Sequence, residues 1–314
     1  MRALARKVEQ DLDCATERTD RESNPVTVSS AIRVLKPSLS KAELRVAEAL
    51  LSNYPVSGIT TASALAQQAG VSDPTVTRLV SRLGFINFSD MRDSLIKELE
   101  LRLSPPKYSN PLTLDRTAKE YAVTAAKELS NQIQRSMGAL SEEDISSAVE
   151  LLGDRRKDVY VTGGRASRTV AMQASWALQV IRPKVRFLED SEGARINALL
   201  DIGKNSVVLL LDYRRYQREA IEFARSVQES GASLIVMTDP FLSPASAHAK
   251  VVLTTEIEGL SPFNTMVPTL ALLELLTSLV AREVFGLDDS RLNRYVELSR
   301  GMLLGRSGTA QTDQ

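Results

Sequence analysis

The stretch TASALAQQAGVSDPTVTRLVSRLGF, residues 61–85, decides the fold of the N-terminal part of the chain. It divides into two short helical segments, 61–69 and 74–83, on either side of Gly70. Glycine adopts the left-handed backbone of a tight turn without steric cost. Ala66, four residues earlier, is a small residue at the place where two crossing helices approach most closely. The pattern therefore predicts a helix-turn-helix.

The second of these segments has two chemically different faces. Ser72 is suited to its N-cap, and Pro74 to its first turn, where a missing N–H is tolerated. An apolar stripe at helical spacing consists of Val76, Leu79, Val80 and Leu83. The other face carries hydroxyl and arginine side chains, which suit base edges and phosphates. The candidate DNA-binding residues are Ser72, Thr75, Thr77, Arg78, Ser81 and Arg82.

Further helices and a linker complete the first domain. Ser40 followed by Glu43 is a capping box that opens a helix ending before Pro55, and residues 88–103 favour another helix. The segment SPPKYSNP that follows contains three prolines and predicts a linker. We therefore divide the chain into a mobile tail (1–28), a helix-turn-helix domain (29–104), a linker (105–113), a second domain (114–304) and a tail (305–314).

The second domain alternates between strand and helix patterns. Helical stretches at 114–137 and 142–152 precede short β-branched runs, and a long apolar helix at 264–285 and another at 288–301 end the pattern. The predicted strands cover 158–162, 184–189, 206–212, 233–238 and 250–254. Strands separated by helices indicate βαβ units. We expect an α/β domain with a parallel sheet of about five strands and helices on both faces.

Composition excludes several classes of site. The 314 residues include 39 basic and 39 acidic side chains, so positive charge for nucleic acid has to be concentrated locally. Cys14 and His248 are the only cysteine and histidine, which argues against a zinc site, a cysteine nucleophile and a Ser-His-Asp triad. We expect no cofactor and no metal. Without a signal peptide or an apolar run of membrane length, we expect a cytoplasmic protein with no membrane partner.

The first predicted strand runs into TGGRAS, where glycines, a hydroxyl and a helix N-terminus form a candidate anion cradle. Ligands of open parallel sheets bind at the carboxyl ends of the strands. The spacing differs from the dinucleotide-binding G-x-G-x-x-G pattern, so NAD binding is not supported. The candidate effector-binding residues in this segment are Gly163, Gly164, Arg165 and Ser167.

Specific motifs in both parts resemble a known family. LSKAELRVAEALLSNY (39–54) followed by the helix-turn-helix stretch looks like the N-terminal domain of RpiR-type transcriptional regulators, and the rest is similar to their SIS (sugar isomerase) domain. The most specific positions are Arg78, Leu83, Gly84, Phe85, Phe88, Met91 and Arg92. The resemblance covers about residues 30–300. It implies operator DNA as a partner, and an SIS domain that binds a phosphorylated sugar or related metabolite.

The third strand ends in DYRRYQRE, where SIS domains that bind a sugar phosphate typically have a hydroxyl-rich S-x-S-G-x-T loop. This chain has Asp212, Arg214, Arg215 and Gln217 there. Two interpretations remain open. Arg214 or Arg215 binds an anionic group while Asp212 binds a hydroxyl or an amine. Alternatively, Asp212 and the arginines form an internal ion pair that fills the pocket or builds a subunit contact.

The SIS resemblance also makes Thr238 and Glu256 candidate effector-binding residues, because they follow the fourth and fifth strands. We expect a non-enzymatic regulator that binds double-stranded operator DNA as a homodimer or homotetramer and senses a small anionic metabolite, either a sugar phosphate or a carboxylate. One alternative is a DNA-binding protein whose SIS-like domain only oligomerises. Another is a sugar-phosphate isomerase, with Asp212, Glu192 or Glu256 as the base.

Overall fold

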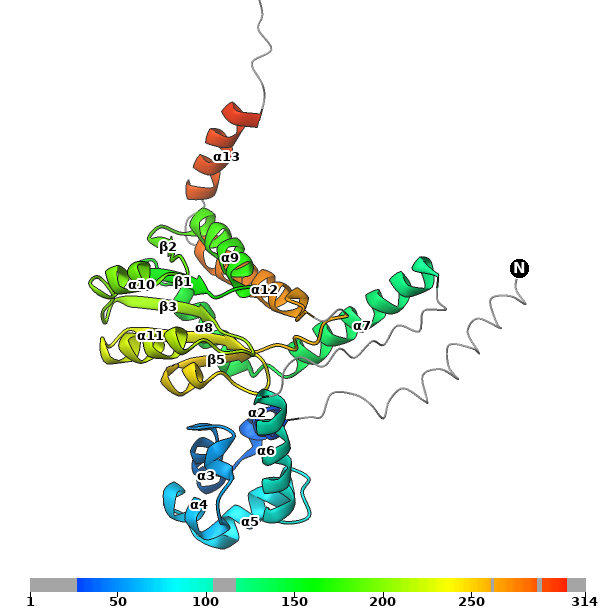
Figure 1. The fold of residues 1–314 in the computed structure, drawn as a ribbon. Helices are drawn as coiled ribbons and strands as arrows, with labels where there is room; N and C mark the ends of the chain where they lie inside the picture. Colours follow the sequence, from blue (N-terminus) through cyan, green and yellow to red (C-terminus); the bar gives the residue numbers. More distant parts are fainter. Residues whose placement is uncertain (1–26, 104–116, 261–262, 287–289, 304–314) are drawn as a thin grey trace, which may run out of the picture.

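The computed structural model describes residues 27–103, 117–260, 263–286 and 290–303. A helical N-terminal domain lies below an α/β domain in Figure 1. The N-terminal elements are α2 (Val28–Leu35), η1 (Lys36–Ser38), α3 (Lys41–Leu51), η2 (Val56–Gly58), α4 (Ala62–Ala69), α5 (Asp73–Arg82) and α6 (Phe88–Leu103). The predicted capping box is present, since Ser40 and Glu43 exchange hydrogen bonds at the start of α3.

Helix α2 was not predicted from the sequence. Thr27 and Val28, which we placed in the mobile tail, are the N-cap and the first residue of this helix, and both are buried. The Thr27 hydroxyl accepts a hydrogen bond from the Ser30 N–H, which satisfies one free donor of the first turn. The folded domain therefore begins slightly earlier than expected. The predicted linker, the C-terminal tail and residues 1–26 lie outside the described residues.

The second domain is built on a parallel sheet with strand order β2-β1-β3-β4-β5, and its parallel pairing confirms the prediction. The strands are β1 (Asp158–Gly163), β2 (Val185–Phe187), β3 (Ser206–Leu211), β4 (Ser233–Thr238) and β5 (Val251–Thr254). In the central pair, Gly163 at the end of β1 lies opposite Leu211 at the end of β3. The loops that follow these two strands are therefore neighbours at one edge of the sheet.

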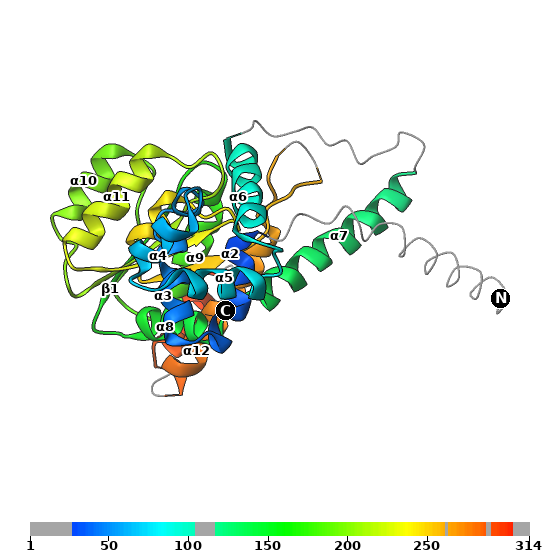
Figure 2. The same ribbon diagram turned by 90° about the horizontal axis from the view of Figure 1, so that it is seen from below.

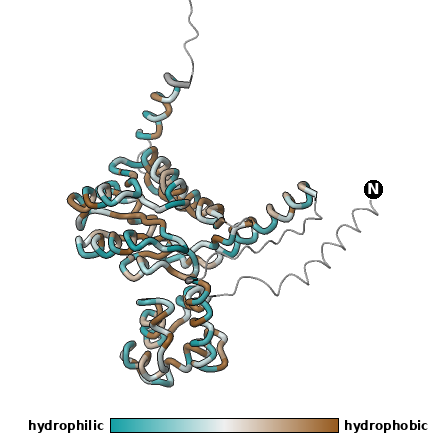
Figure 3. Tube along the Cα trace, viewed as in Figure 1, coloured by the Kyte–Doolittle hydropathy of each residue, from teal (hydrophilic) through white to brown (hydrophobic). Residues whose placement is uncertain are grey.

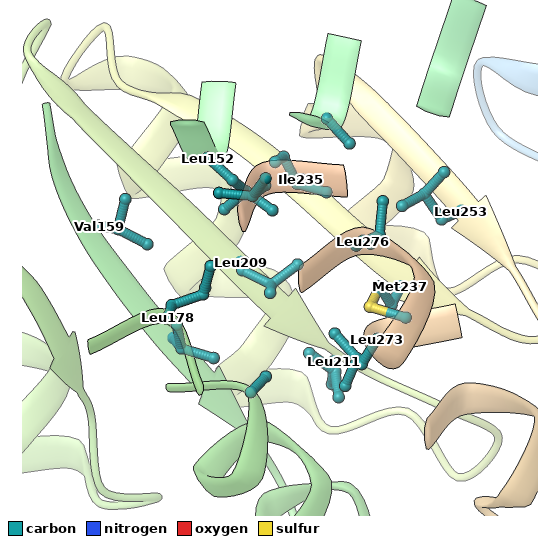
Figure 4. Packing of buried hydrophobic residues seen from close by; sticks show 14 of the residues in the cluster. Leu152, Val159, Leu178, Leu209, Leu211, Ile235, Met237, Leu253, Leu273 and Leu276 are labelled. Carbon is teal, nitrogen blue, oxygen red and sulfur yellow. The ribbon is translucent and has the colours of Figure 1, made fainter. Parts of the chain in front are cut away.

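Helices cover both faces of the sheet. Alternate residues of each strand point to opposite sides, so that Leu209 belongs to one hydrophobic cluster and Val208 to the other. Figure 4 shows the first cluster, in which Leu273 and Leu276 pack against strand residues such as Leu209. The strands form a hydrophobic layer inside more polar helices (Figure 3). The helices are α8 (Glu142–Gly153), α9 (Ser167–Ile181), α10 (Glu192–Leu199), α11 (Arg218–Glu229) and α12 (Val267–Phe285), with η3 (Pro244–His248) before β5.

Two helices extend away from the body of the sheet domain. Helix α7 (Ala118–Gly138) projects to one side, and α13 (Ser290–Leu303) projects from the end opposite the N-terminal domain (Figure 1). Seen from below in Figure 2, α3, α4 and α5 lie in front of the sheet domain. Among the described residues, no helix is both long enough and apolar enough to span a membrane.

Candidate functional site

The turn of the helix-turn-helix has the geometry that the sequence predicts. Gly70 ends α4 with φ 62° and ψ 41°, the left-handed conformation. Its N–H and that of Val71 donate to carbonyl oxygens in the last turn of α4, which are otherwise without helical partners. The turn thereby fixes the direction in which α5 leaves α4.

The exposed face of α5 presents most of the predicted DNA-binding side chains. Ser72 occupies the N-cap position, although its hydroxyl lies 3.2 Å from the Thr75 hydroxyl and makes no capping bond to the backbone. Thr77 and Ser81 are exposed and donate to carbonyl oxygens of their own helix. The sequence prediction that Thr75 lies on this face is wrong. This residue is buried beneath the start of α5 and does not lie on the exposed face.

The two arginines of α5 differ in their surroundings. Arg82 forms an ion pair with Glu43 at 3.0 Å and donates to Ser38, which ties the end of α5 to the start of α3. The pKa of Glu43 is lowered, mainly by its hydrogen bonds with Ser40 and to a smaller extent by Arg82. The Arg78 side chain is exposed and has no hydrogen-bond or ion-pair partner among the described residues. Its guanidinium is therefore available to an external acceptor.

Arg45 is a further exposed cation beside this face, and sequence reasoning missed it. It lies on α3, and its guanidinium is 3.7 Å from the position that a Cβ atom on Gly70 would occupy. The helical pattern of α3 marks Arg45 as solvent-facing, but its position over the turn depends on how α3 crosses α4. Such a contact between helices is not readable from spacing within one helix.

At the other candidate site, the loop after β1 packs against the loop after β3. Glycine at position 164 permits this close approach, because a Cβ there would overlap the side-chain amide of Gln217 and displace it. Ser167 is buried, and its hydroxyl lies 2.7 Å from the Gly164 carbonyl oxygen and 2.9 Å from that of Leu211. The Ser167 hydroxyl, predicted to bind the effector, is thus engaged within the protein. Gly163 is buried directly beside it.

Two predicted arginines remain exposed at this edge. Arg165 follows β1 and Arg215 follows β3, and neither side chain has an ion-pair or hydrogen-bond partner in the described ranges. Both have positive φ, 41° and 68° respectively, although neither is a glycine. Such backbone costs on the order of 1 kcal/mol per residue and concentrates at ligand-binding sites. Helix α9, which starts beside Arg165, has no side-chain cap.

Asp212 lies near these loops as a buried carboxylate. It accepts a hydrogen bond from the Ser243 hydroxyl and a long one, 3.5 Å, from the Gln217 N–H. Burial raises the pKa of the Asp212 carboxyl to about 6, and the bond from Ser243 opposes that rise. Asp212 is therefore a buried acid that would gain from an additional hydrogen-bond donor.

Arg214 forms an internal ion pair, but its acidic partners differ from the predicted one. Its guanidinium pairs with Glu258, lies 3.9 Å from an Asp239 oxygen and stacks 4.5 Å from the centre of the Phe241 ring. The ion-pair interpretation therefore applies to Arg214, with Asp239 and Glu258 as the acids in place of Asp212. Arg214 is not available to bind an anion in this arrangement.

Arg195 is a site residue that sequence reasoning missed. This α10 arginine is buried, pairs with Asp190 and has an Nε atom without a hydrogen-bond partner among the described residues. Its positive charge lowers the pKa of Asp212, which places it in the same cluster of groups. Helix α10 has the sequence EGARINAL, and its polar residues do not predict that Arg195 is buried.

The structure corrects the prediction for the remaining two candidate effector-binding residues. Thr238 is completely buried, and its hydroxyl accepts a hydrogen bond from the Ser243 N–H. Glu256 forms a bidentate ion pair with Arg135 of α7, with Oε2 2.7 Å from Nη2, so its carboxylate is engaged within the protein. Within the described residues, no group of three or more His, Cys, Asp or Glu side chains is placed to bind a metal.

Both domains of the chain match families of known proteins. Residues 26–102 match the model of the helix-turn-helix domain of the rpiR family, and residues 154–279 match that of the SIS domain. The chain is of the RpiR type. An RpiR-type chain combines a DNA-binding module with a sheet domain of the sugar isomerase fold, and this one is a transcriptional regulator with an SIS domain.

Relatives of this RpiR-type chain include regulators from several bacteria. It is 22% identical over 279 residues to an uncharacterized HTH-type transcriptional regulator of Caldanaerobacter subterraneus, covering 86% of this chain and 94% of that protein. It is 24% identical to the HTH-type transcriptional regulator HexR of Escherichia coli, covering 76% and 81%. The sugar isomerase domain of an RpiR transcription factor from Sphaerobacter thermophilus superposes with a TM-score of 0.53 at 20% identity, over 58% of this chain and 99% of that one.

Proposed function

We propose that the protein binds operator DNA through α5 and that a small anionic metabolite, bound where β1 and β3 end, changes this binding. The observation that carries the proposal is the exposed polar face of α5 with its unpaired Arg78. Recognition helices enter the major groove and read bases mostly with their N-terminal residues. Ser72 is the N-cap of α5, Thr77 ends its N-terminal half and Arg78 follows directly, so these three would face bases. Ser81 and Arg45 would contact phosphates, as would Arg82 if it exchanges its bonds to Glu43 and Ser38 for a phosphate.

Replacing Arg78 by alanine should weaken operator binding by roughly 5- to 150-fold, the range for losing one arginine contact to a guanine. The reason is that the free guanidinium forms two parallel hydrogen bonds with a guanine edge. Fluorescence anisotropy measures the effect, using duplexes from the DNA upstream of the protein's own gene and neighbouring genes. The salt concentration is fixed, because phosphate contacts make affinity fall steeply with salt.

Arg225→Ala is the matched control for Arg78→Ala. Arg225 is an exposed arginine on α11, 3.9 Å from Glu229, and its loss changes the net charge by the same amount. The control should bind the operator as the wild type does. An equal loss in both variants would indicate a general charge effect, and no loss in Arg78→Ala would remove Arg78 from the contact face.

The effector part of the proposal rests on the two exposed arginines. Arg165 and Arg215 lie on touching loops, with Arg165 just before the N-terminus of α9, and both lack an acidic partner in the described part of the chain. Arginines without acidic partners beside a helix N-terminus favour a phosphate or a carboxylate. Asp212 adds a buried acceptor that suits a hydroxyl of the same ligand. These features support a sugar phosphate or a sugar acid.

The double variant Arg165→Ala/Arg215→Ala should lose the response to metabolite while its operator affinity without metabolite stays close to that of wild type. The screen adds phosphorylated sugars, sugar acids and other small anionic metabolites to the anisotropy assay. An undiminished response in the double variant would show that the ligand binds elsewhere. Arg156→Ala/Arg225→Ala, which also removes two exposed arginines, serves as the control for the loss of surface charge.

We also propose that the chain is a symmetric oligomer that contacts its copy through α9 and α13. Met172, Trp176 and Leu298 are 52%, 55% and 53% exposed on these helices, and clustered apolar exposure of this kind marks interaction surfaces. Trp176 and Leu298 both line a groove between the two helices.

One observation favours the alternative in which the SIS domain only oligomerises. The Gln217 amide occupies the space beside Gly164, which a small ligand would otherwise enter. In that case the protein binds its operator specifically and no metabolite in the screen alters the affinity. A shift caused by one anionic metabolite would decide against this alternative.

A further inference from the structure

The sheet domain and the DNA-binding domain are joined through the turn that follows β4. The Pro240 carbonyl oxygen accepts hydrogen bonds from the hydroxyls of Ser29 at 2.5 Å and Thr27 at 3.3 Å, both at the start of α2. Leu242, two residues later, is buried in the hydrophobic core of the N-terminal domain. The β4 turn, residues 239–243, therefore belongs structurally to both domains.

The other end of the β4 turn is fixed by the buried carboxylate of Asp239. This group accepts hydrogen bonds from the N–H groups of Arg214 at 2.7 Å and Phe241 at 2.9 Å, and from the Tyr216 hydroxyl at 2.9 Å. Two of these three donors belong to the loop after β3, residues 212–217. Asp239 thus connects the β3 loop to the β4 turn.

The same β3 loop contacts the candidate effector site. Gln217 packs on Gly164 of the β1 loop, and the exposed Arg215 lies between Arg214 and Tyr216 in the chain. Asp212, at the start of the loop, accepts a hydrogen bond from Ser243 of the β4 turn. A ligand that moved the β3 loop would therefore act on the β4 turn at both of its ends.

A second connection runs directly to α6. The Arg102 guanidinium lies 4.8 Å from the centre of the Tyr216 ring and donates to the Tyr54 carbonyl oxygen at 2.8 Å. Tyr54 and Glu98 in turn accept hydrogen bonds from the first N–H groups of α2. Tyr216 thereby contacts both Asp239 and Arg102, which lead to α2 and α6.

We infer that Tyr216 couples the effector site to the DNA-binding domain, through Asp239 to α2 and through Arg102 to α6. This inference rests on the proposed effector site and adds the route by which it acts. Coupling of this kind requires an element whose arrangement both sites influence. The β3 loop and the β4 turn supply one, since Gln217 contacts Gly164 of the effector site while Pro240 and Leu242 contact the DNA-binding domain.

The first experiment uses Tyr216→Phe without DNA. This change removes the hydroxyl bonded to Asp239 and keeps the ring beside Arg102. Hydrogen exchange of the full chain should become about fivefold faster in α2 as well as in the β4 turn, the effect of one lost hydrogen bond. Arg218→Ala, which removes an exposed arginine next to the same loop, is the control and should leave α2 unchanged. Faster exchange confined to the β3 loop, or none at all, would overturn the coupling.

The second experiment uses coupling in the opposite direction, because linkage between two binding sites is reciprocal. Adding operator duplex to the wild type should change exchange in residues 212–217, which lie outside the DNA-binding domain. The change should shrink roughly threefold or more in Arg102→Ala, as expected for a residue on the coupling route. It should persist in Lys97→Ala, which removes another α6 cation that is exposed. An unchanged loop in DNA-bound wild type, or equal responses in both variants, would refute the inference.

The two experiments separate the inference from the proposed function. A wild-type protein that prefers no duplex over random DNA would refute the proposed operator binding. The Tyr216→Phe exchange measurement would still decide whether the β3 loop and α2 are coupled, because it contains no DNA and no effector.

Discussion

Replacing Leu79 by alanine should destabilise the DNA-binding domain by about 2–5 kcal/mol, the usual cost of truncating a buried leucine. Leu79 is completely buried on the inner face of α5, where it packs in the core that also contains Leu50, Leu65 and Met91. The cavity left behind has no route to collapse without moving α3 or α4. Denaturant unfolding followed by circular dichroism measures the change.

Arg78→Ala is the control for Leu79→Ala, since it alters the neighbouring residue on the opposite face. It should leave the unfolding midpoint unchanged while operator binding falls. A loss of less than about 1 kcal/mol in Leu79→Ala would contradict the burial of this side chain. Operator binding by folded Leu79→Ala at low temperature should stay close to wild type, because the outer face of α5 is intact.

The helix-turn-helix and the sheet were predictable because both depend on local patterns. The apolar stripe of α5 and the left-handed Gly70 are determined within one segment. The β-branched runs place each strand to within two residues, and the helices between them require parallel pairing. The ends of some strands differ slightly from the prediction, as in β2, because the point where a strand ends depends on its pairing with a neighbouring strand.

Positions that depend on contacts between distant segments were not predictable in this way. Thr75 lies one turn before the inward Leu79, at the border of the apolar stripe, and spacing alone does not reveal that it is buried where α5 begins. The buried Arg195 pairs with the partly exposed Asp190, and no sequence motif predicts this pair. Helix α2 is short, and part of what buries it, Pro240 and Leu242, comes from the other domain. Propensity within the helix carries no information about such a partner.

The β3 loop illustrates how far chemistry can be inferred from residue types. The spacing of Asp212, Arg214 and Arg215 allowed either an anion site or an internal ion pair. Arg214 turns inward to Asp239 and Glu258, while Arg215 remains exposed with positive φ. Which arginine turned inward depended on the buried Asp239, 25 residues from Arg214 along the chain. Residue types within the loop could not reveal that choice.

Asp212→Asn should stabilise the protein at neutral pH and flatten the pH dependence of its stability. Burial raises the pKa of Asp212 to about 6 in the folded protein, against about 3.9 in the unfolded chain. A group with a raised folded pKa contributes stability below about pH 4 that is lost as the pH rises through about 6. Two pKa units correspond to roughly 3 kcal/mol, so asparagine should gain up to that amount at neutral pH.

Urea unfolding of wild type and Asp212→Asn at pH 4.5, 6.0 and 7.5 tests this, because contributions of other acids cancel in the difference. Asp201→Asn, which changes an exposed carboxyl, is the control and should show no such trend. A difference that does not grow with pH would refute the raised pKa. A ligand hydroxyl that donates to the Asp212 carboxylate would remove part of the same cost at neutral pH. The destabilising charge in the unliganded protein is therefore also a source of ligand affinity, and Asp212→Asn should bind the effector more weakly while being more stable.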